Sequence, residues 1–390
     1  MIARTLGAHS PRAVRDALRG KGWDEVRSEA AAEGMASLAV ELSGLDADVI
    51  EALVRHGGSL GLDILTGSDW AVVGGTEARL GALARPWVVP APLAELASAL
   101  GQVLTPEQPR HWVTARGTIQ CDRPLIVGIL NITPDSFSDG GQFLGTDAAI
   151  AQADRLVADG ADILDVGGES TRPGSVSVPE AEERQRILPV VTALERRHPG
   201  TPISVDTVKS TVAQAALGVG AAIINDVSAL RLDPDMGPVV AEGRAGVILM
   251  HSRGTVSTMA RLDHAEYAPD VVVAVRDELK DAIEQALTAG IGADHVAVDP
   301  GFGFAKTAEQ NLLLLDQLAA LRVLAHPILV GPSRKRFLGR ATGRDVGARD
   351  AATAAACVLA YERGARLFRV HNVALVRDAL AVAHAVRGMT

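Results

Sequence analysis

Polar side chains recur through residues 125–372, and each group directly follows a short apolar run. The first is Asn131, which opens the polar stretch 131–141 (NITPDSFSDGG). The later groups are 167–174, Asp206 with Thr207, Asn225 with Asp226, 251–253, 299–301, 331–335, and His371 with Asn372, with Arg369 just ahead of the last pair. Since no local motif joins these groups, they form one site only if the fold brings the ends of the apolar runs together.

The residue types in these groups suit two kinds of ligand. The carboxylates of Asp206 and Asp299 suit a flat heterocycle with adjacent N–H donors, because one carboxylate can accept two parallel hydrogen bonds. Arg369 and His371 suit an anionic, phosphorylated group, and Asn131 together with water can bind a divalent cation. The chain has neither the Walker GxxxxGK[ST] pattern nor the Rossmann GxGxxG pattern, which argues against nucleotide or nicotinamide chemistry.

Several of these residues also have an ordinary structural explanation. Asp206 can cap the helix that is predicted to begin near Val208, and Lys335 can belong to a solvated first helical turn. Asn225 with Asp226 can simply end a strand. A shared site nevertheless explains polar residues at every run end better than a series of coincidences does. A structural role is favoured for Asp226, Ser252 and Arg253, and Asn225 is left open.

The elements that must position these groups are short strands that alternate with amphipathic helices. The predicted strands are 125–130, 161–166, 202–205, 222–224, 245–250, 296–298, 327–330 and 366–370. Eight strands, each followed by a helical pattern over about 270 residues, predict an α/β fold of the (β/α)₈ TIM-barrel type. An open doubly wound sheet is the rival, but it usually has fewer strands and does not spread polar residues over every strand end. A closed barrel brings all eight carboxyl ends to one rim, where the active sites of this fold lie.

Residues 1–110 carry a separate pattern, which predicts a smaller N-terminal α+β domain. Its predicted elements are helices at 11–21, 46–55 and 76–83, a strand at 37–42 and a hairpin across 62–73. Prolines punctuate residues 86–109, so the boundary is placed near residue 110 and the barrel domain at 111–390. That second domain begins with a hairpin expected to turn at Arg116 and Gly117. The N-terminal segment contains no group of catalytic residues, and its role is not evident.

Composition and charge narrow the range of partners and locations that this protein can have. The formal charge of −9 over 390 residues argues against a nucleic-acid partner. No apolar run approaches the roughly 18 residues that a membrane span needs, and Met1 leads into no apolar signal core, so we expect a cytoplasmic protein without membrane contact. Cys121 and Cys357 lack metal-ligand spacing and are interpreted as reduced, structural thiols.

Over about residues 120–390 the sequence resembles the dihydropteroate synthases of the folate pathway. The motifs that carry the resemblance are GILNITPDSFSDGG, DVGGESTRPG, SVDT, INDVS, MHSRG, DPGFGF, SRKRF and RVH. The resemblance implies condensation of 6-hydroxymethyl-7,8-dihydropterin diphosphate with p-aminobenzoate to 7,8-dihydropteroate and pyrophosphate, with Mg²⁺ on the diphosphate. Corrinoid methyltransferases share a pterin-binding barrel, but we do not expect SRKRF and RVH together in them.

The resemblance also implies roles for individual residues. The pterin pocket of the family falls on Asp206, Asn225, Met250, Asp299 and Lys335, and its diphosphate and metal site falls on Asn131, Arg369 and His371. The p-aminobenzoate pocket falls on two loops, with Asp135, Phe137, Thr171, Arg172 and Pro173. The carboxylate of that substrate is expected at the N-terminus of a helix that starts near Ser333. The residues expected to promote catalysis are Asn131, Asp206, Lys335, Arg369 and His371; no nucleophile is needed if the C–O bond to pyrophosphate ionises before the amine attacks.

Three positions depart from the family pattern: Asn372 where Asp is expected, Ala305 where Gly is usual, and Val256 where Pro is commoner. Asn372 is expected to bear most on the diphosphate end. A catalytically silent pterin-binding paralogue, made a partner protein by its extra domain, is the alternative function, and the intact Asn131, Arg369 and His371 speak against it. A homodimer is expected, as in the family, through the small-residue face of an Ala-rich helix at 348–360.

Overall fold

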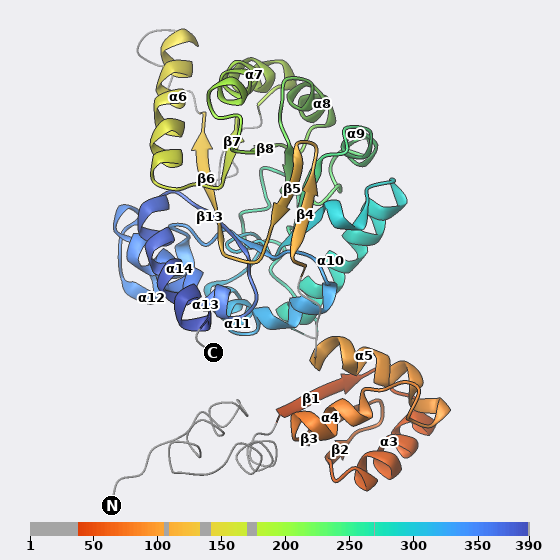
Figure 1. Cartoon of the computed structure of the whole chain (residues 1–390). Helices are drawn as coiled ribbons and strands as arrows, with labels where there is room; N and C mark the ends of the chain where they lie inside the picture. Colours follow the sequence, from red (N-terminus) through yellow and green to blue (C-terminus); the bar gives the residue numbers. More distant parts are fainter. Residues whose placement is uncertain (1–37, 105–108, 133–141, 170–177, 269, 389–390) are drawn as a thin grey trace, which may run out of the picture. The chain divides into compact units, whose positions relative to one another are not determined.

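The computed structural model describes residues 38–104, 109–132, 142–169, 178–268 and 270–388. These residues divide near position 108 into two compact units, each of which is described by itself. Figure 1 shows the elements of both units, coloured along the chain.

The N-terminal unit is a small α+β fold built on an antiparallel sheet in the order β1-β3-β2. Its elements are β1 (Leu38–Ser43), α3 (Ala47–Ser59), β2 (Asp63–Thr66), β3 (Trp70–Gly75), α4 (Glu77–Leu83), η1 (Ala91–Leu93) and α5 (Ala94–Leu104). The hairpin β2–β3 and the helix after it were both predicted, and Thr76 caps that helix by accepting the N–H of Arg79 at 3.3 Å. Leu53, Val73 and Leu80 belong to a hydrophobic core that this unit does not share with the barrel.

The second unit is a barrel of eight parallel strands, as predicted. Its strands are β6 (Leu125–Asn131), β7 (Ile163–Gly167), β8 (Ile203–Asp206), β9 (Ile223–Asp226), β10 (Gly246–Met250), β11 (Val296–Asp299), β12 (Leu329–Val330) and β13 (Leu367–Val370). The sheet order runs β11-β10-β9-β8-β7-β6-β13-β12. A parallel bridge between Val298 and Ile328 joins the two ends of this order. The sheet is therefore closed, which rules out the open doubly wound alternative.

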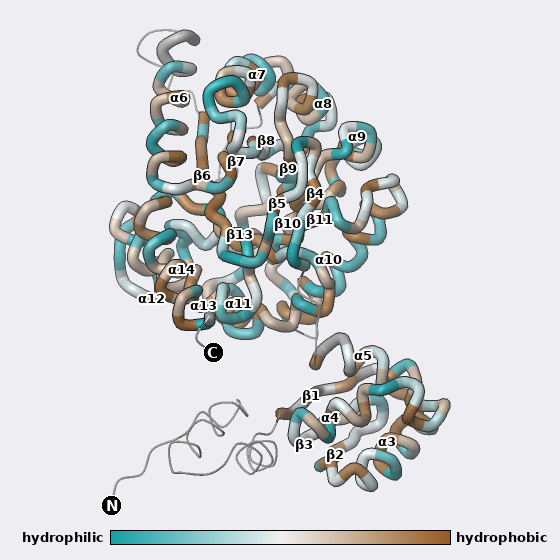
Figure 2. The backbone as a smooth tube through the Cα atoms, viewed as in Figure 1, coloured by the Kyte–Doolittle hydropathy of each residue, from teal (hydrophilic) through white to brown (hydrophobic). Residues whose placement is uncertain are grey.

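Helices follow the strands and surround the barrel (Figure 1). They are α6 (Gln142–Ala158), α7 (Glu180–Arg197), α8 (Ser210–Gly218), α9 (Met236–Glu242), α10 (Val271–Thr288), α11 (Ala308–Asp316), α12 (Arg336–Thr342), α13 (Asp350–Glu362) and α14 (Val373–Gly388), with short 3₁₀ turns η3 (Ala293–His295), η4 (Leu318–Leu324) and η5 (Val346–Ala348). Figure 2 shows strand β6 largely hydrophobic, while the covering helices alternate hydrophobic and hydrophilic residues. None of the described helices is long and apolar enough to span a membrane.

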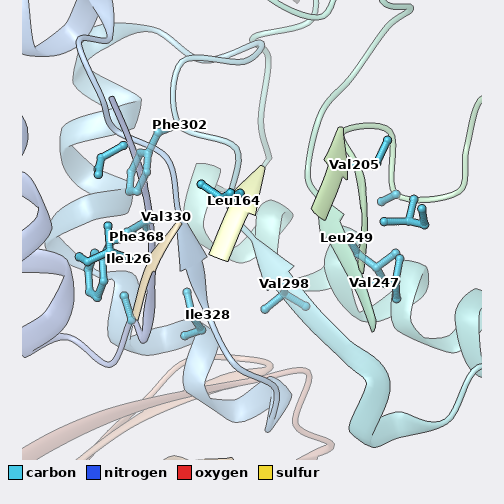
Figure 3. Close-up of a cluster of buried hydrophobic side chains, with 14 of the residues drawn as sticks. Ile126, Leu164, Val205, Val247, Leu249, Val298, Phe302, Ile328, Val330 and Phe368 are labelled. Atoms are coloured by element: carbon cyan, nitrogen blue, oxygen red, sulfur yellow. The ribbon is translucent and has the colours of Figure 1, made fainter. Parts of the chain in front are cut away.

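Alternate strand residues pack into two separate hydrophobic layers, as the two-residue period of a strand requires. Ile126, Leu164 and Val298 belong to the layer that includes buried residues of the helices, part of which Figure 3 shows. Their neighbours Val127, Ile163 and Ala297 belong to a second cluster together with Trp112. This second cluster fills the barrel interior at the amino ends of the strands, so polar inward positions remain only toward the carboxyl ends.

A hairpin of β4 (His111–Thr114) and β5 (Gly117–Gln120) closes the amino end of the barrel. Trp112 is fully buried, and its indole N–H donates to the carbonyl oxygen of His295 at 2.7 Å. Thr114 pairs with Gly117, so the turn residues are Ala115 and Arg116. The predicted turn at Arg116 and Gly117 was therefore one residue too late.

Candidate active site

A cavity of about 790 Å³ opens at the carboxyl ends of the strands. Its volume lies in the range that small-molecule sites occupy. Five predicted site residues line it, from the ends of three strands and the loop after a fourth: Asn131, Asp206, Lys335, Arg369 and His371. The barrel therefore brings together residues that are up to 240 positions apart in the sequence.

Arg369 lies between two carboxylates at the base of this cavity. Its Nε donates to Asp165 Oδ2 at 2.6 Å, and its Nη2 donates to Asp206 Oδ2 at 2.8 Å. Asp165 is fully buried in the middle of β7, and the Arg369 side chain is 21% exposed. Arg369 was expected at the diphosphate and Asp206 in the pterin pocket, so this ion pair joins the two predicted subsites.

The carboxyl group of Asp206 has an unusually high pKa. Burial raises it most; the charge of Arg369 opposes the rise, and the nearby Asp165 carboxylate adds to it, which places the pKa at about 7. The amide of Asn225 donates to Asp165 at 3.3 Å, so Asn225 belongs to the same buried network. Asp206 does not cap a helix, because α8 begins at Ser210 with Lys209 as its N-cap residue.

Asp299 lies at the end of β11 with one carboxylate oxygen engaged by its own loop. The N–H of Gly301 donates to Asp299 Oδ1 at 2.7 Å. Burial raises the pKa of Asp299 to about 6, although the Gly301 bond and the charge of Lys335 lower it. No hydrogen bond from a described residue is found at Oδ2, which leaves that oxygen as an acceptor for a ligand.

Part of the cavity wall is apolar and includes Ile129 and Phe304. Met250 and Phe304 pack in one cluster with Val208 and Val227. Lys335 Nζ lies 4.0 Å from the centre of the Phe304 ring, a cation–π contact that fixes the ring beside the cavity. A flat ligand can therefore contact an apolar surface while its polar edge faces the carboxylates.

His371 and Ser333 both line the cavity and contact each other. Ser333 Oγ lies 2.9 Å from His371 Nδ1 and also accepts the backbone N–H of His371 at 3.2 Å. The prediction that a helix starts near Ser333 was wrong, because α12 begins at Arg336 and Lys335 is its N-cap residue. Arg334 adopts φ +57, which an α-helix does not accommodate, so the chain turns before the helix begins.

Three residues that were assigned a structural role do make local contacts. Asp226 accepts hydrogen bonds from the N–H groups of Ser228 and Leu230, both at 2.8 Å. Ser252 Oγ donates to a backbone carbonyl at 2.6 Å, and Arg253 pairs with Glu278.

Asn372 was expected to bear on the diphosphate, but its side chain is engaged elsewhere. Its amide donates to Asp350 Oδ2 at 3.0 Å, and its oxygen accepts the N–H of Leu375 at 3.2 Å. Asparagine suits this position, because an aspartate would present no donor to Asp350.

Oxygen donors converge where a divalent cation was expected. A Cβ added to Gly167 would lie 3.6 Å from Asn131 Oδ1 and 3.8 Å from Asp206 Oδ2, so the missing side chain leaves room between these oxygens. Oxygen ligands and room for water fit Mg²⁺, which is usually held by one or two protein groups and substrate phosphates. Among the described residues, no cluster of three His, Cys, Asp or Glu side chains suits a metal.

Five predicted residues fall outside the part of the chain that the structure describes: Asp135, Phe137, Thr171, Arg172 and Pro173. Asp165 was not among the predicted site residues, because only residues at strand ends were considered. The signal was a lone carboxylate within an otherwise apolar strand, two positions after the inward-facing Ile163.

Comparison with known proteins gives a consistent result. Residues 127–371 match the family described as pterin binding enzyme. The dihydropteroate synthase of Synechocystis is 43% identical over 265 residues, which cover 68% of this chain and 90% of the relative. That of Mycobacterium leprae is 45% identical over 263 residues, which cover 66% and 91%.

Solved structures agree with this relationship. The Xanthomonas albilineans dihydropteroate synthase with 4-aminobenzoic acid is similar at a TM-score of 0.66 and 45% identity, covering 71% of this chain and 98% of that chain. The Burkholderia cenocepacia dihydropteroate synthase complexed with 7,8-dihydropteroate is similar at a TM-score of 0.66 and 41% identity, covering 73% and 98%.

Proposed function

The chain belongs to the dihydropteroate synthase family, and we propose that the cavity at its barrel mouth condenses 6-hydroxymethyl-7,8-dihydropterin diphosphate with p-aminobenzoate. The products are 7,8-dihydropteroate and pyrophosphate. The observation that carries the assignment is the carboxylate of Asp206 in one cavity with Arg369 and His371, together with the buried Asp299, whose Oδ2 lies 4.0 Å from a Cβ built on the cavity residue Gly331. This set offers acceptors to a heterocycle and cations to a leaving phosphate.

Pterin recognition falls to the carboxylates and the apolar wall. Asp299 Oδ2 and the oxygens of Asp206 and Asn225 accept the N–H groups along one edge of the ring. Met250 and Phe304 contact its flat surface, and Lys335 is held beside it by the Phe304 ring. Buried acceptors left without a donor are costly, so a ring without these N–H groups is rejected.

Departure of pyrophosphate is assisted by positive charge. The C–O bond between the pterin methylene and the diphosphate breaks first, and its electron pair leaves with pyrophosphate. Arg369 and His371 stabilise the developing negative charge. When bound, Mg²⁺ supplies further neutralisation of the diphosphate, and Asn131 together with water would hold it.

The amine of p-aminobenzoate then attacks the pterin methylene carbon, and a proton leaves the nitrogen as the C–N bond forms. No protein nucleophile takes part. Both cysteines are buried, and burial raises the pKa of the Cys121 thiol to about 12, so neither supplies a thiolate. Thr171, Arg172 and Pro173, which lie outside the described residues, are the positions that the family resemblance assigns to the p-aminobenzoate pocket. A Yersinia pestis relative has been solved with a sulfonamide drug, and we expect sulfonamides to compete with p-aminobenzoate here.

A homodimer and a cytoplasmic location complete the proposal. The Ala-rich helix α13 has Ala351, Ala355 and Leu359 on its exposed side, which allows close approach of a second copy. Light scattering of the purified protein tests the dimer.

The function is tested by incubating the full-length protein with both substrates and Mg²⁺ and measuring dihydropteroate and pyrophosphate. We expect equal amounts of the two products, and loss of turnover with EDTA. A catalytically silent paralogue would bind the pterin and release neither product. A methyltransferase-like barrel would bind the pterin but leave the diphosphate intact.

A further inference from the structure

Lys306 is a buried lysine outside the cavity lining described above, in the loop between β11 and α11. It is only 4% exposed. Its Nζ has three acceptors: His251 Nδ1 at 2.9 Å, the carbonyl oxygen of Gly301 at 3.2 Å and that of Phe304 at 3.1 Å. No carboxylate of a described residue forms a salt bridge with it. Buried charges are usually paired with an opposite charge, so this lysine requires another explanation.

The ammonium group of Lys306 can use all of its hydrogen-bond donors without a counterion. An ammonium group has three N–H donors and no acceptor, which matches the three acceptors around Lys306. Burial lowers the pKa of Lys306 to about 7, and the negative charge of Asp299 opposes this shift. Burying this lysine costs solvation free energy, and the three hydrogen bonds that it makes are what this cost is set against.

Lys306 is linked through His251 to a network of polar side chains that includes Glu278 and Arg253. His251 Nε2 lies 3.1 Å from Glu278 Oε2, and Glu278 is in turn paired with Arg253. Burial and the charge of Lys306 lower the pKa of His251 to about 4. A neutral His251 donates from Nε2 to Glu278 and presents the lone pair of Nδ1 to Lys306.

On its inner side Lys306 holds a turn that shapes the candidate pterin pocket. The carbonyl groups that it bonds belong to Gly301 and Phe304. Gly301 donates its N–H to Asp299 Oδ1, and the ring of Phe304 lies against Lys335. Gly301 has φ +69, and a Cβ there would lie 1.9 Å from the backbone oxygen of His251, so the turn is packed without spare room.

We propose that Lys306 is a positioning residue for the pterin, which orients the Asp299 carboxylate and the Phe304 ring through the turn between them. Lys306 itself contacts no substrate. This inference rests on the proposed function and deepens it, because it adds a residue that fixes the pterin pocket and leaves the p-aminobenzoate side unaffected.

The variant Lys306→Met tests the inference, since it keeps an unbranched apolar stem and removes the three donors. Binding of 6-hydroxymethylpterin to the full-length variant is followed by pterin fluorescence, and the KM values of both substrates are measured. We expect the pterin Kd to rise about tenfold or more, as two turn carbonyls lose their donor. The KM of p-aminobenzoate should stay unchanged, a division between substrates that general loss of stability does not produce.

Two further variants keep the test decisive. Trp112→Phe removes a buried hydrogen bond at the opposite end of the barrel, and it should lower the melting temperature without changing the pterin Kd. Lys306→Gln retains amide donors, and its pterin Kd should lie between those of the wild type and Lys306→Met, so it serves if the methionine variant does not fold.

Wild-type pterin affinity in a folded Lys306 variant, or an equal loss for both substrates, would overturn the inference alone. Failure of the wild-type protein to bind pterin would overturn the proposed function, and this inference with it.

Discussion

Asp206 and Asp299 are carboxylic acids whose ordinary ionisation is disturbed by the cavity that they serve. Burial is the largest cause in both cases, and the resulting pKa values are about 7 and about 6. An ionised carboxylate only accepts hydrogen bonds, whereas a protonated one presents an O–H to the ligand. Recognition of a donor edge therefore requires both groups to lose their protons.

This requirement predicts a pH dependence of pterin binding. The affinity for unphosphorylated 6-hydroxymethylpterin should increase as the pH rises from about 5 to about 8, through the two raised pKa values. The unphosphorylated ligand is used so that titration of the diphosphate does not contribute. Calorimetric titration across this range provides the measurement, and a flat profile would show that the carboxylates do not face the pterin.

The raised pKa values of Asp206 and Asp299 affect folding stability in the opposite direction: a rise in pH favours ligand binding but destabilises the fold. Between the unfolded pKa near 4 and the raised folded values, the native state binds more protons than the unfolded chain, so the free energy of unfolding decreases as the pH rises. These two acids therefore disfavour folding under the conditions in which they bind the ligand best. Such a conflict is expected of groups that are retained for function.

At the scale of elements, site residues at the ends of strands could be predicted from the sequence, whereas those inside strands could not. Asp206 and Asp299 were predicted because each follows an apolar run directly, whereas Asn225 was left open on that pattern and was assigned by the family resemblance. Asp165 lies inside a strand, and its partner Arg369 is 204 residues away in the sequence. No local pattern specifies that pair; it depends on β7 and β13 both turning polar residues inward on either side of β6.

Loop conformation was the other feature that sequence patterns did not resolve. The start of α12 was misplaced because Arg334 adopts a left-handed backbone conformation, which residue type alone does not indicate. Lys306 was overlooked for a related reason. Its role depends on where the carbonyl groups of the β11–α11 loop point, and those directions follow from the positive φ angles of Gly301 and Gly303.

The β11–α11 loop also provides a test of backbone strain. Ala305 has φ +47, where the resembled family usually has glycine. The neighbouring contacts hold it there, since its N–H donates to the carbonyl of Met259 at 2.8 Å and its carbonyl accepts Tyr267 O–H at 2.9 Å. A left-handed conformation costs a residue with a side chain about 1–2 kcal/mol.

We therefore predict that Ala305→Gly raises the free energy of unfolding by about 1 kcal/mol, after the greater freedom of glycine in the unfolded chain is allowed for. Urea denaturation measures the change. Ala352→Gly, inside helix α13, is the matched control, and it should lower the free energy of unfolding by about 1 kcal/mol. Equal destabilisation by both substitutions would mean that Ala305 is not strained.

At the scale of the whole molecule, the candidate chemistry lies in one of two units. The residues that line the cavity run from Ile129 to His371 and all belong to the barrel. The N-terminal unit has its own hydrophobic core and none of these residues. Family membership also rests on the barrel alone, since the matched segment is 127–371.

Deletion of residues 1–107 should consequently leave kcat and both KM values largely unchanged. Stability or assembly can still suffer, so circular dichroism and light scattering accompany the assay. A truncated barrel that is folded and inactive would show that the N-terminal unit contributes to the site.

Two buried aspartates at strand ends allow a direct test of whether inward carboxylates at the barrel mouth bind the pterin. Asp299 uses Oδ1 for Gly301, and its Oδ2 lies 4.0 Å from a Cβ built on Gly331, which lines the cavity. Asp226, at the end of β9, uses both oxygens for its own turn. Asparagine at either position keeps the volume and introduces an N–H₂ donor.

The measurement is calorimetric titration of 6-hydroxymethyl-7,8-dihydropterin diphosphate into the wild type, Asp299→Asn and Asp226→Asn. Asp299→Asn should weaken binding about tenfold or more, because a ligand donor then meets another donor, while its melting temperature holds or rises. Asp226→Asn should bind like the wild type, whatever its stability. Unchanged affinity in Asp299→Asn, or equal losses in both variants, would contradict the placement of the pterin at the barrel mouth.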